Sequence, residues 1–309
     1  MLSDLETNLA LRLARRRAAR PGIVQADRSD EGLGRVALVT GASSGIGASF
    51  AELYAAKGYT VLALARRQPL LEELAARLDR RWRATVHPIT VDLAERDAAD
   101  QVASALRTLG VNVDVLVNNA GFGVMGRYLN RSWDDHERFI RAVGIVPAEL
   151  CHRLVPRMVQ QRWGRVINVS SVAALFAGSP EMVLYSGVKS LVLKMTEGLA
   201  AEYERSGVHF TASVPGVTDT EFFSRNDMAE FSRTRLKAQL PMMRPEVVAR
   251  QAYEACEQGR RVIIHGRQHK AAMFATVHSP PAIRYWLVRR ATNLEFDGGC
   301  RGSEERTRW

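Results

Sequence analysis

The sequence predicts a doubly wound α/β fold, with helices on both faces of a parallel sheet. Short apolar runs alternate with helical stretches from residue 35 to residue 264 of the 309-residue chain. The apolar runs are unbroken, which is typical of strands that are buried on both faces. A glycine-rich turn joins the first run to the first helix of this series, as expected of a strand–helix–strand unit.

The elements follow one another in the order that this fold requires. The first strand is the run Val-Ala-Leu-Val, and a helical stretch separates each later apolar run from the next. No internal boundary or low-complexity tract interrupts the series, so we expect one domain over residues 34–266. The predicted strands are 36–39, 60–65, 85–91, 113–117, 165–169, 209–214 and 261–264, and the predicted helices are 48–57, 69–83, 95–109, 131–161, 186–205 and 245–257.

The two ends of the chain lie outside this series. We expect residues 1–33 to form a helical arm and a linker, because leucines recur at helical spacing and a polar, turn-rich stretch follows at 26–34. Residues 267–309 mix apolar and basic residues and end in a polar stretch that we expect to be frayed. We expect these arms to extend an interface between copies, binding to an anionic membrane being the alternative.

Composition excludes several classes of protein. With 46% hydrophobic and 25% charged residues, the chain is an ordinary globular protein. No run approaches about 18 consecutive apolar residues, and the N-terminus lacks the features of a signal peptide, so we expect a cytoplasmic protein. Cys151, Cys256 and Cys300 are scattered, which predicts neither a disulfide framework nor a zinc site. The histidines show no metal spacing either, so we expect no catalytic metal.

Charge is the one unusual bulk feature. The net charge of +10, from 43 Lys and Arg against 33 Asp and Glu, favours anionic partners. Much of the excess lies in the two terminal arms, and no nucleic-acid-binding motif accompanies it. We therefore expect attraction for a phosphorylated cofactor or an anionic surface, and no nucleic acid partner.

The turn after the first strand has the composition of a phosphate-binding loop. It runs from Thr40 to Gly47 and leads into a helix, whose N-terminus offers N–H groups and a partial positive charge. Glycines let the backbone approach a pyrophosphate closely. The turn therefore predicts a dinucleotide site, a tight strand–helix connection being the alternative. The expected contacts are Gly41, Ser43, Ser44, Gly45, Ile46 and Gly47.

The end of the second strand predicts which dinucleotide is bound. An NAD site usually has an Asp or Glu there, which accepts a hydrogen bond from the ribose 2′-hydroxyl. This chain has Arg66 and Arg67 instead, and a guanidinium binds a 2′-phosphate through charge-assisted hydrogen bonds. We expect NADPH in preference to NADH, with Arg66 as the main contact. A solvated pair of arginines at the start of a helix is the alternative.

Ser171, Tyr185 and Lys189, which come later in the chain, indicate acid and base chemistry. Tyr185 and Lys189 are four residues apart at the start of a predicted helix, so they lie on one face of it. A nearby ammonium favours the phenolate, so we expect Lys189 to lower the pKa of Tyr185. Ser171, which follows a strand, is expected to hydrogen bond the same substrate oxygen as Tyr185. A surface pair with a half-buried ring is the alternative for Tyr185 and Lys189.

Together these motifs resemble the short-chain dehydrogenase/reductase family over residues 34–266. The resemblance implies a Rossmann fold with a seven-stranded sheet in a single domain. It also implies a homodimer or homotetramer that uses the long helices at 131–161 and 186–205. The matching motifs are the glycine-rich turn, Asp92-Leu93, Asn118-Asn119-Ala120-Gly121, Ser171, Tyr185 with Lys189, and Pro215-Gly216 followed by Thr218 and Thr220.

The resemblance further implies roles for individual residues. Lys189 would bind the nicotinamide ribose as well as act on Tyr185, which exchanges a proton with the substrate oxygen. The other implied cofactor contacts are Asp92 and Leu93 at the adenine, Asn118, Ala120 and Gly121 along the cleft, and Pro215, Gly216, Val217, Thr218 and Thr220 around the nicotinamide.

One position departs from the family pattern. Where the family usually has an Asn whose main-chain carbonyl holds a water for proton relay, this chain has Val143. Gly144 and Pro147 are expected to break the helix locally and free a carbonyl, because proline has no N–H. If the relay is lost, a slow enzyme or a non-enzyme follows. The spacing between Ser171 and Tyr185 is slightly longer than the commonest pattern, which leaves Ser170 as a substitute for Ser171.

The stretch between Thr220 and Pro245 is expected to close over the substrate and the nicotinamide. It carries aromatic and methionine residues without a strand pattern, which favours a medium or large lipophilic carbonyl substrate. Arg225 and Arg233 are candidate anchors for an anionic group, a solvated charge being the alternative. Candidate pocket walls, with core packing as the alternative, are Phe122, Val124, Met125, Phe176, Met182 and Phe223.

The sequence thus predicts an NADPH-dependent reductase that converts a ketone or an aldehyde to an alcohol. Two alternatives stay open. The same site could run as an alcohol dehydrogenase on a lipid or a secondary metabolite. A dinucleotide-binding regulatory protein without catalysis is the other.

Overall fold

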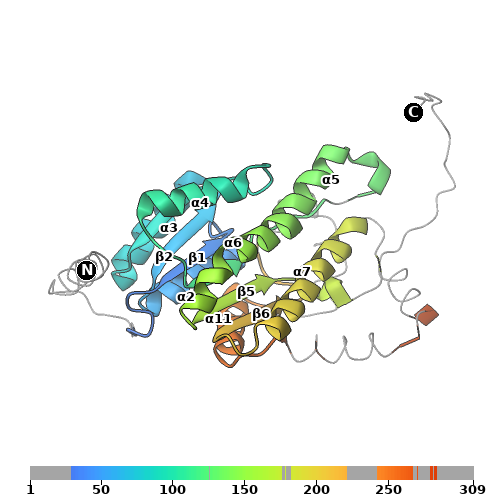
Figure 1. Cartoon of the computed structure of the whole chain (residues 1–309). Helices are drawn as coiled ribbons and strands as arrows, with labels where there is room; N and C mark the ends of the chain where they lie inside the picture. Colours follow the sequence, from blue (N-terminus) through green and yellow to red (C-terminus); the bar gives the residue numbers. More distant parts are fainter. Residues whose placement is uncertain are drawn as a thin grey trace.

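The fold is built on a seven-stranded sheet with the strand order β3-β2-β1-β4-β5-β6-β7 (Figure 1). The computed structural model describes residues 29–124, 126–175, 178, 182–220, 242–266, 270, 279–280 and 282–283. All neighbouring strands are parallel, which confirms the doubly wound sheet. The strands are β1 Val36–Thr40, β2 Thr60–Ala65, β3 Val86–Thr90, β4 Val115–Asn118, β5 Gly164–Val169, β6 Val208–Val214 and β7 Val262–Ile264.

Helices cover both faces of the sheet, and Figure 1 shows α6 and α7 crossing in front of the strands. Alternate side chains of β1 belong to the two cores: Leu38 packs with residues of α4, α6 and α7, whereas Ala37 and Val39 pack with residues of α2, α3 and α11. This is the alternation that a strand imposes. The helices are α2 Gly45–Ala56, α3 Gln68–Trp82, α4 Ala98–Leu109, α5 Trp133–Ile140, α6 Val146–Gln160, α7 Val183–Glu202 and α11 Pro245–Glu257.

The helical stretch predicted over residues 131–161 begins at Trp133 and is interrupted in its middle. The structure has α5, then a π-helical segment η2 at Arg141–Ile145, and then α6. Pro147 stands at the start of α6, where the missing N–H of proline costs least. The helix predicted to begin at residue 186 begins at Val183, so Tyr185 lies within α7.

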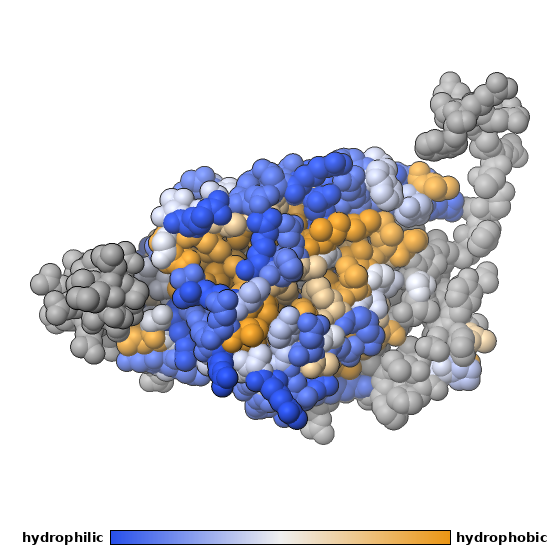
Figure 2. Space-filling view, in the orientation of Figure 1, coloured by the Kyte–Doolittle hydropathy of each residue, from blue (hydrophilic) through white to orange (hydrophobic). Residues whose placement is uncertain are grey.

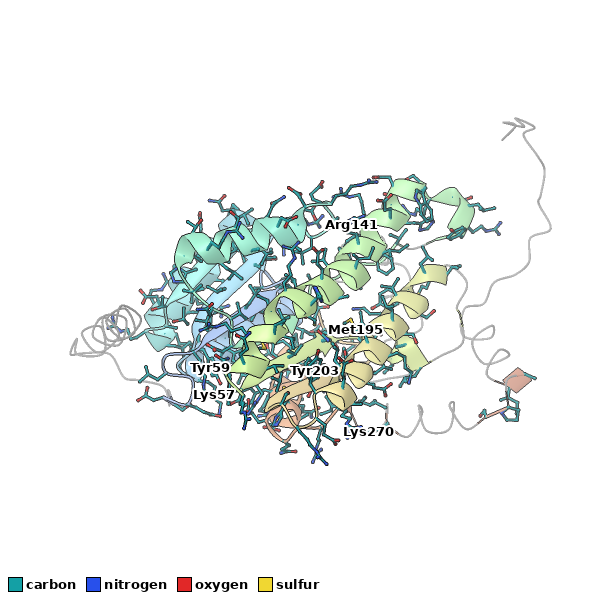
Figure 3. The ribbon with its side chains drawn as sticks, in the orientation of Figure 1. Lys57, Tyr59, Arg141, Met195, Tyr203 and Lys270 are labelled. Atoms are coloured by element: carbon teal, nitrogen blue, oxygen red, sulfur yellow. The ribbon has the colours of Figure 1, made fainter. Side chains whose placement is uncertain are left out.

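Part of the predicted linker is packed against the domain. The N–H of Gly32 donates to the carbonyl of Lys57 at 2.8 Å. Glu31 accepts hydrogen bonds from the amine of Lys57 at 2.6 Å and from the hydroxyl of Tyr253. These two hydrogen bonds lower the pKa of Glu31. Figure 3 places Lys57 beside Tyr59, at the end of the molecule where β2 begins. The segment before β1 is therefore fastened to α2 and α11.

The outer arms fall largely outside the described part of the chain. The helix predicted in residues 1–33 lies before residue 29, and most of the tail predicted at 267–309 is also not described. Within the described ranges, no helix has both the length and the apolar character to cross a membrane.

Two glycines let the first helix meet the end of the first strand. Gly41 has a φ of 68°, in the left-handed region that favours glycine. Gly47 lies so close to it that a Cβ at position 47 would stand 2.1 Å from the carbonyl oxygen of Gly41. The approach of α2 to β1 therefore requires glycine at position 47.

We expect Gly47→Ala to lower the free energy of unfolding by about 2 kcal/mol or more, because the backbone of the turn must move to admit the methyl group. Gly198→Ala is the matched control, since its added Cβ on α7 meets no atom within 4 Å. Alanine is favoured over glycine in a helix by up to about 1 kcal/mol, so the control should be neutral or stabilised. Urea denaturation measures both, and a Gly47→Ala protein as stable as wild type would contradict the packing described.

Candidate functional site

The carboxyl ends of β1 and β4 lie where the strand order reverses. Ligands of open α/β sheets bind outside the strand ends at such a point. The hydroxyl of Thr40, at the end of β1, donates to the carbonyl of Val117 at 3.2 Å. It accepts hydrogen bonds from the N–H groups of Asn119 and Ala120 at 2.9 and 3.0 Å. The glycine-rich turn and the segment 118–121 are therefore neighbours, as the prediction requires.

The glycine-rich turn ends at the N-terminus of α2 and fits a pyrophosphate. Ser44 is the N-cap residue of α2, but its side chain does not cap the helix. The hydroxyls of Ser43 and Ser44 instead accept hydrogen bonds from Nη2 of Arg67 at 2.8 and 3.2 Å. The N–H groups of the first helical turn are thus left for an anion. The close packing at Gly41 and Gly47 brings the backbone of the turn into position to hold that anion.

Arg66 and Arg67 both border this turn, but in different ways. Arg67 contacts the turn directly, whereas the Arg66 side chain is 61% exposed, with Nη1 3.7 Å from Oδ2 of Asp92. The Arg66 guanidinium also lies 6.0 Å from the ring centroid of Phe122. Burial, and then the charge of Arg66, lower the pKa of Arg67. The two cations therefore repel each other at the place predicted for a phosphate.

Ser171, Tyr185 and Lys189 come together at the carboxyl end of β5. A side-chain hydrogen bond joins Tyr185 to Ser171, which follows β5 by two residues. Nζ of Lys189 donates to the carbonyl of Val169 at 2.9 Å and lies 6.0 Å from the centroid of the Tyr185 ring. The three residues predicted to perform the chemistry are thus neighbours in space.

Ser170 faces another way. It is buried, and its hydroxyl donates to the main-chain carbonyl of Lys189 at 2.7 Å. Its side chain therefore fastens β5 to α7, while Ser171 contacts Tyr185. The geometry favours Ser171 over Ser170 as the residue beside the phenol.

Burial sets the pKa of both groups on α7. It raises the pKa of Tyr185 to about 12, against a smaller opposing effect of the hydrogen bond with Ser171. It lowers the pKa of Lys189 to about 8. The pKa of Tyr185 is therefore raised and not lowered, because desolvation of the buried phenolate is the largest effect on it. Tyr185 keeps its proton over the whole range in which Lys189 titrates.

The loop after β4 reaches the amine of Lys189. A Cβ built on Gly121 would lie 3.7 Å from Nζ of Lys189 and 3.8 Å from Cγ2 of Val143. Gly121, which was predicted to line the cofactor cleft, thus stands beside the candidate catalytic amine. Val143 is buried next to them and presents a methyl group where the family usually has an amide.

The π-helical segment departs from the α-helical hydrogen-bond pattern near this point. The N–H of Val146 donates to the carbonyl of Arg141, five residues back, and Pro147 has no N–H to donate. Within this described segment, the carbonyls of Ala142 and Val143 therefore lack the donors that an α-helix supplies four residues on. Figure 3 labels Arg141, the first residue of the segment, on the ribbon that joins α5 to α6. The local break expected from the sequence is present in this form.

Close packing accompanies the break. A Cβ built on Gly144 would lie 3.1 Å from side-chain atoms of Val188 and Leu191 on α7. A glycine at position 144 therefore lets α7, which carries Tyr185 and Lys189, pack directly on the π-helical segment.

A buried polar network beneath the site was not predicted. Nδ2 of Asn118 donates to Oδ1 of Asn168 at 2.8 Å and to the carbonyl of Pro147 at 3.3 Å. Nδ2 of Asn168 in turn donates to Oγ1 of Thr196 at 2.9 Å. The Asn118 side chain, expected to line the cleft, instead ties β4 to β5 and α6. The sequence held one signal for this network. Asn118 ends β4 and Asn168 lies near the end of β5, which are neighbouring strands.

The stretch 215–220 spans the two halves of the site. The N–H of Val172 donates to the carbonyl of Pro215 at 3.0 Å, and Thr218 pairs with Met243. At the other end, Cγ2 of Thr220 would lie 2.9 Å from a Cβ on Gly45. The stretch therefore runs from the end of β6, beside the segment that follows β5, to the glycine-rich turn, with Gly216 and Val217 between.

Aromatic rings pack next to the phenol of Tyr185. Phe139 stacks on Tyr185 at a centroid distance of 6.0 Å, and Phe122 meets Phe139 edge-on at 5.9 Å. Phe139 was not predicted, although it precedes Val143 by one helical turn.

Leu93, expected at the adenine, is buried in the core. Of the other predicted residues, Val124 packs against the core and Met182 precedes α7, whereas Met125, Phe176, Phe223, Arg225 and Arg233 are not among the described residues.

The described cysteines lie in the core. Cys151 and Cys256 are free and buried, and burial raises the pKa of each thiol to about 12. In the described ranges, His, Cys, Asp and Glu side chains form no group of three that could hold a metal ion.

A family model described as short chain dehydrogenase matches residues 35–230. The chain belongs to the short-chain dehydrogenase family. It is 32% identical over 254 residues to a short chain dehydrogenase of Pseudocercospora fijiensis, an overlap of 77% of this chain and 80% of that relative. The resemblance predicted from the motifs is confirmed. This short-chain dehydrogenase is therefore an NAD(P)-dependent oxidoreductase that acts on carbonyl or alcohol groups of small molecules.

Solved structures confirm the Rossmann fold of this short-chain dehydrogenase. A 7beta-hydroxysteroid dehydrogenase superposes with a TM-score of 0.75 at 25% identity, covering 86% of this chain and 99% of the other. A short-chain dehydrogenase from Sphingobium yanoikuyae, in complex with NADPH, superposes with a TM-score of 0.68 at 27% identity, covering 89% of this chain and 99% of the other.

The two neighbouring serines should respond differently to truncation. Ser170→Ala removes a buried hydrogen bond and should lower the free energy of unfolding by about 1 kcal/mol. Ser171→Ala should lower kcat by about 100-fold, the usual cost of one donor to a developing oxyanion, with a smaller change in stability. Steady-state kinetics and urea denaturation of both variants test this. Full activity in Ser171→Ala would contradict the assignment.

Proposed function

We propose that this short-chain dehydrogenase is an NADPH-dependent reductase of ketones or aldehydes. The observation that carries the proposal is the meeting of Ser171, Tyr185 and Lys189 at the end of β5, next to Gly121. A hydroxyl and a phenol that are hydrogen bonded to each other are suited to bind and protonate one carbonyl oxygen.

Each of the three side chains has one task in the proposed reaction. A bound nicotinamide dinucleotide supplies the hydride that such a reduction requires. Tyr185 donates its hydroxyl proton to the carbonyl oxygen, and Ser171 donates a hydrogen bond to the same oxygen as negative charge develops. Lys189 holds the ribose of the cofactor and stabilises the phenolate left on Tyr185.

The π-helical segment supplies the route by which Tyr185 regains its proton. Val143 contacts the same loop as Lys189, and the carbonyls of Ala142 and Val143 are released from the helical pattern. A water held by these oxygens and by Lys189 needs no side-chain amide. Pro147 and the π-helical hydrogen bond thus replace the Asn of the family pattern, and the valine at position 143 leaves the relay intact.

The arginines at the end of β2 support NADPH over NADH. Arg66 and Arg67 stand where an NAD site has a carboxylate, and their mutual repulsion is relieved by an anion placed between them. Arg67 also holds Ser43 and Ser44, which ties the phosphate-binding arginines to the pyrophosphate turn. The similar enzyme from Sphingobium yanoikuyae was solved with NADPH.

The rings around Tyr185 support a lipophilic substrate. Phe139 covers one face of the phenol and Phe122 extends the apolar wall. The similar hydroxysteroid dehydrogenase is named for a large apolar substrate. We assign the substrate to the same class, a medium or large lipophilic carbonyl compound.

An exposed apolar surface supports assembly into a homodimer or homotetramer. Figure 2 shows an apolar area over the first half of α7 and the adjoining π-helical segment. Exposed side chains there include Ile145, Val183 and Leu191, which are 42%, 50% and 50% accessible. Contiguous exposed apolar surface of this kind marks an interaction site. A second copy that uses the same helices would cover it.

The test of the proposed function is the rate of NADPH and NADH oxidation over aldehydes and ketones of graded size. We expect turnover with NADPH, a preference for large apolar carbonyls, and a loss of about 1,000-fold or more in Tyr185→Phe, which lacks the proton donor. Tyr128→Phe is the matched control, because Tyr128 lies on the exposed segment before α5. Equal turnover in Tyr185→Phe and wild type would overturn the assignment of Tyr185.

Activity should depend on pH through Lys189. Its ammonium is present below the folded-state pKa of about 8, so kcat/KM for NADPH should fall as pH rises through about 8. Because the folded pKa lies below the unfolded one, the unfolded state binds more protons between about pH 8 and 10.5, and stability from this group rises there as activity falls. Lys189→Met should remove this limb of the profile. Lys194→Met is the control and should keep the fall in kcat/KM, because Lys194 is an exposed lysine on α7. A fall in kcat/KM near pH 8 that persists in Lys189→Met would contradict the prediction.

A further inference from the structure

Charged groups of alternating sign connect α5 to the proposed phosphate site. Asp92, two residues beyond β3, lies between Arg138 of α5 and Arg66. Its Oδ2 accepts a hydrogen bond from Nη2 of Arg138 at 2.8 Å and lies 3.7 Å from Nη1 of Arg66. Its Oδ1 accepts a hydrogen bond from the N–H of Ala94 at 3.0 Å, which fixes the carboxylate in place.

Arg138 is anchored on both sides. Its Nη1 donates to Oε1 of Glu95 at 2.9 Å. The hydrogen bond with Glu95, together with the charge of Asp92, raises the pKa of Arg138. The Arg138 side chain is 34% exposed, against 61% for Arg66. Arg138 is therefore the more firmly held cation of the two, and Arg66 is the more exposed one.

A carboxylate beside a phosphate-binding arginine opposes the binding of phosphate. Asp92 and a 2′-phosphate would compete for the same guanidinium, and the two anions would repel each other. In the structure, Oδ2 of Asp92 lies at hydrogen-bond distance from Arg138 and beyond it from Arg66. The contact with Arg138 thus takes the nearer position on the carboxylate, and Arg66 makes a longer ion pair with it.

We propose that Arg138 is a positioning residue that sets the preference for NADPH. It acts through Asp92: by binding this carboxylate, it keeps Asp92 from closing on Arg66. The inference rests on the proposed NADPH preference and adds to it a residue from α5, remote in sequence from the arginines that follow β2.

Dissociation constants of NADPH and NADH, measured on the full chain by quenching of protein fluorescence, test the proposal. In Arg138→Ala we expect NADPH binding to weaken by about fivefold, the scale of a partly exposed charge interaction, with NADH binding unchanged. Arg96→Ala is the matched control. Arg96 is 82% exposed and pairs with Glu137 at 3.0 Å on the same surface, so its loss should change neither constant.

A second variant separates the electrostatic role from a structural one. Asp92→Asn in the Arg138→Ala background removes the competing charge while it keeps an acceptor for the N–H of Ala94, so the ratio of the two constants should return toward wild type. Arg138→Lys should retain part of the preference. Equal weakening of NADPH and NADH in Arg138→Ala, or no recovery in the double variant, would overturn the role given to Arg138.

The outcome for Arg66→Ala distinguishes this inference from the proposed function. Suppose that the wild type prefers NADPH, that Arg66→Ala loses this preference and that Arg138→Ala keeps it. Such a result would overturn the role of Arg138 alone. If wild type binds both cofactors equally, the proposed cofactor preference fails, and the role of Arg138 fails with it.

Discussion

The hydroxyl group of Thr40 joins the carboxyl ends of the two strands on which the site is built. β1 leads into the glycine-rich turn, β4 leads into the segment that ends at Gly121, and the strand order reverses between them. The Thr40 hydroxyl bonds to main-chain groups on the β4 side, and the side-chain amide of Asn119 returns a hydrogen bond to the Thr40 carbonyl at 2.9 Å. These hydrogen bonds also set the position of the glycine-rich turn relative to the amine of Lys189, because Gly121 lies beside that amine.

Local sequence predicted the sheet, the glycine-rich turn and the shared helical face of Tyr185 and Lys189, because each of these features is local in origin. An unbroken apolar run gives a buried strand, glycine gives the sharp turn, and a spacing of four gives one helical face. The pairing of Asn118 with Asn168 was not predictable in this way, since it depends on which strands become neighbours. The break within residues 131–161 is an intermediate case. Gly144 and Pro147 indicated it, but the π-helical form also involves packing on α7, which is distant in sequence.

The ionisation of the site lies beyond sequence for a different reason. Spacing places an amine near a phenol, which alone lowers the pKa of the phenol. How far water is excluded from both groups depends on the whole surrounding fold, and in this structure exclusion of water dominates for Tyr185 and for Lys189. The resulting order, with an amine that titrates well below the phenol, suits a site whose phenol begins the reaction protonated.

The contacts of Glu31 have a consequence for how the domain opens. Through Lys57 and Tyr253, this residue joins the segment before β1 to the end of α2 and to α11, which itself packs against α2. The beginning of the domain and its last long helix therefore share one set of contacts. Neither can detach without exposing the other, so amide hydrogens of both segments should exchange with solvent as a single cooperative unit.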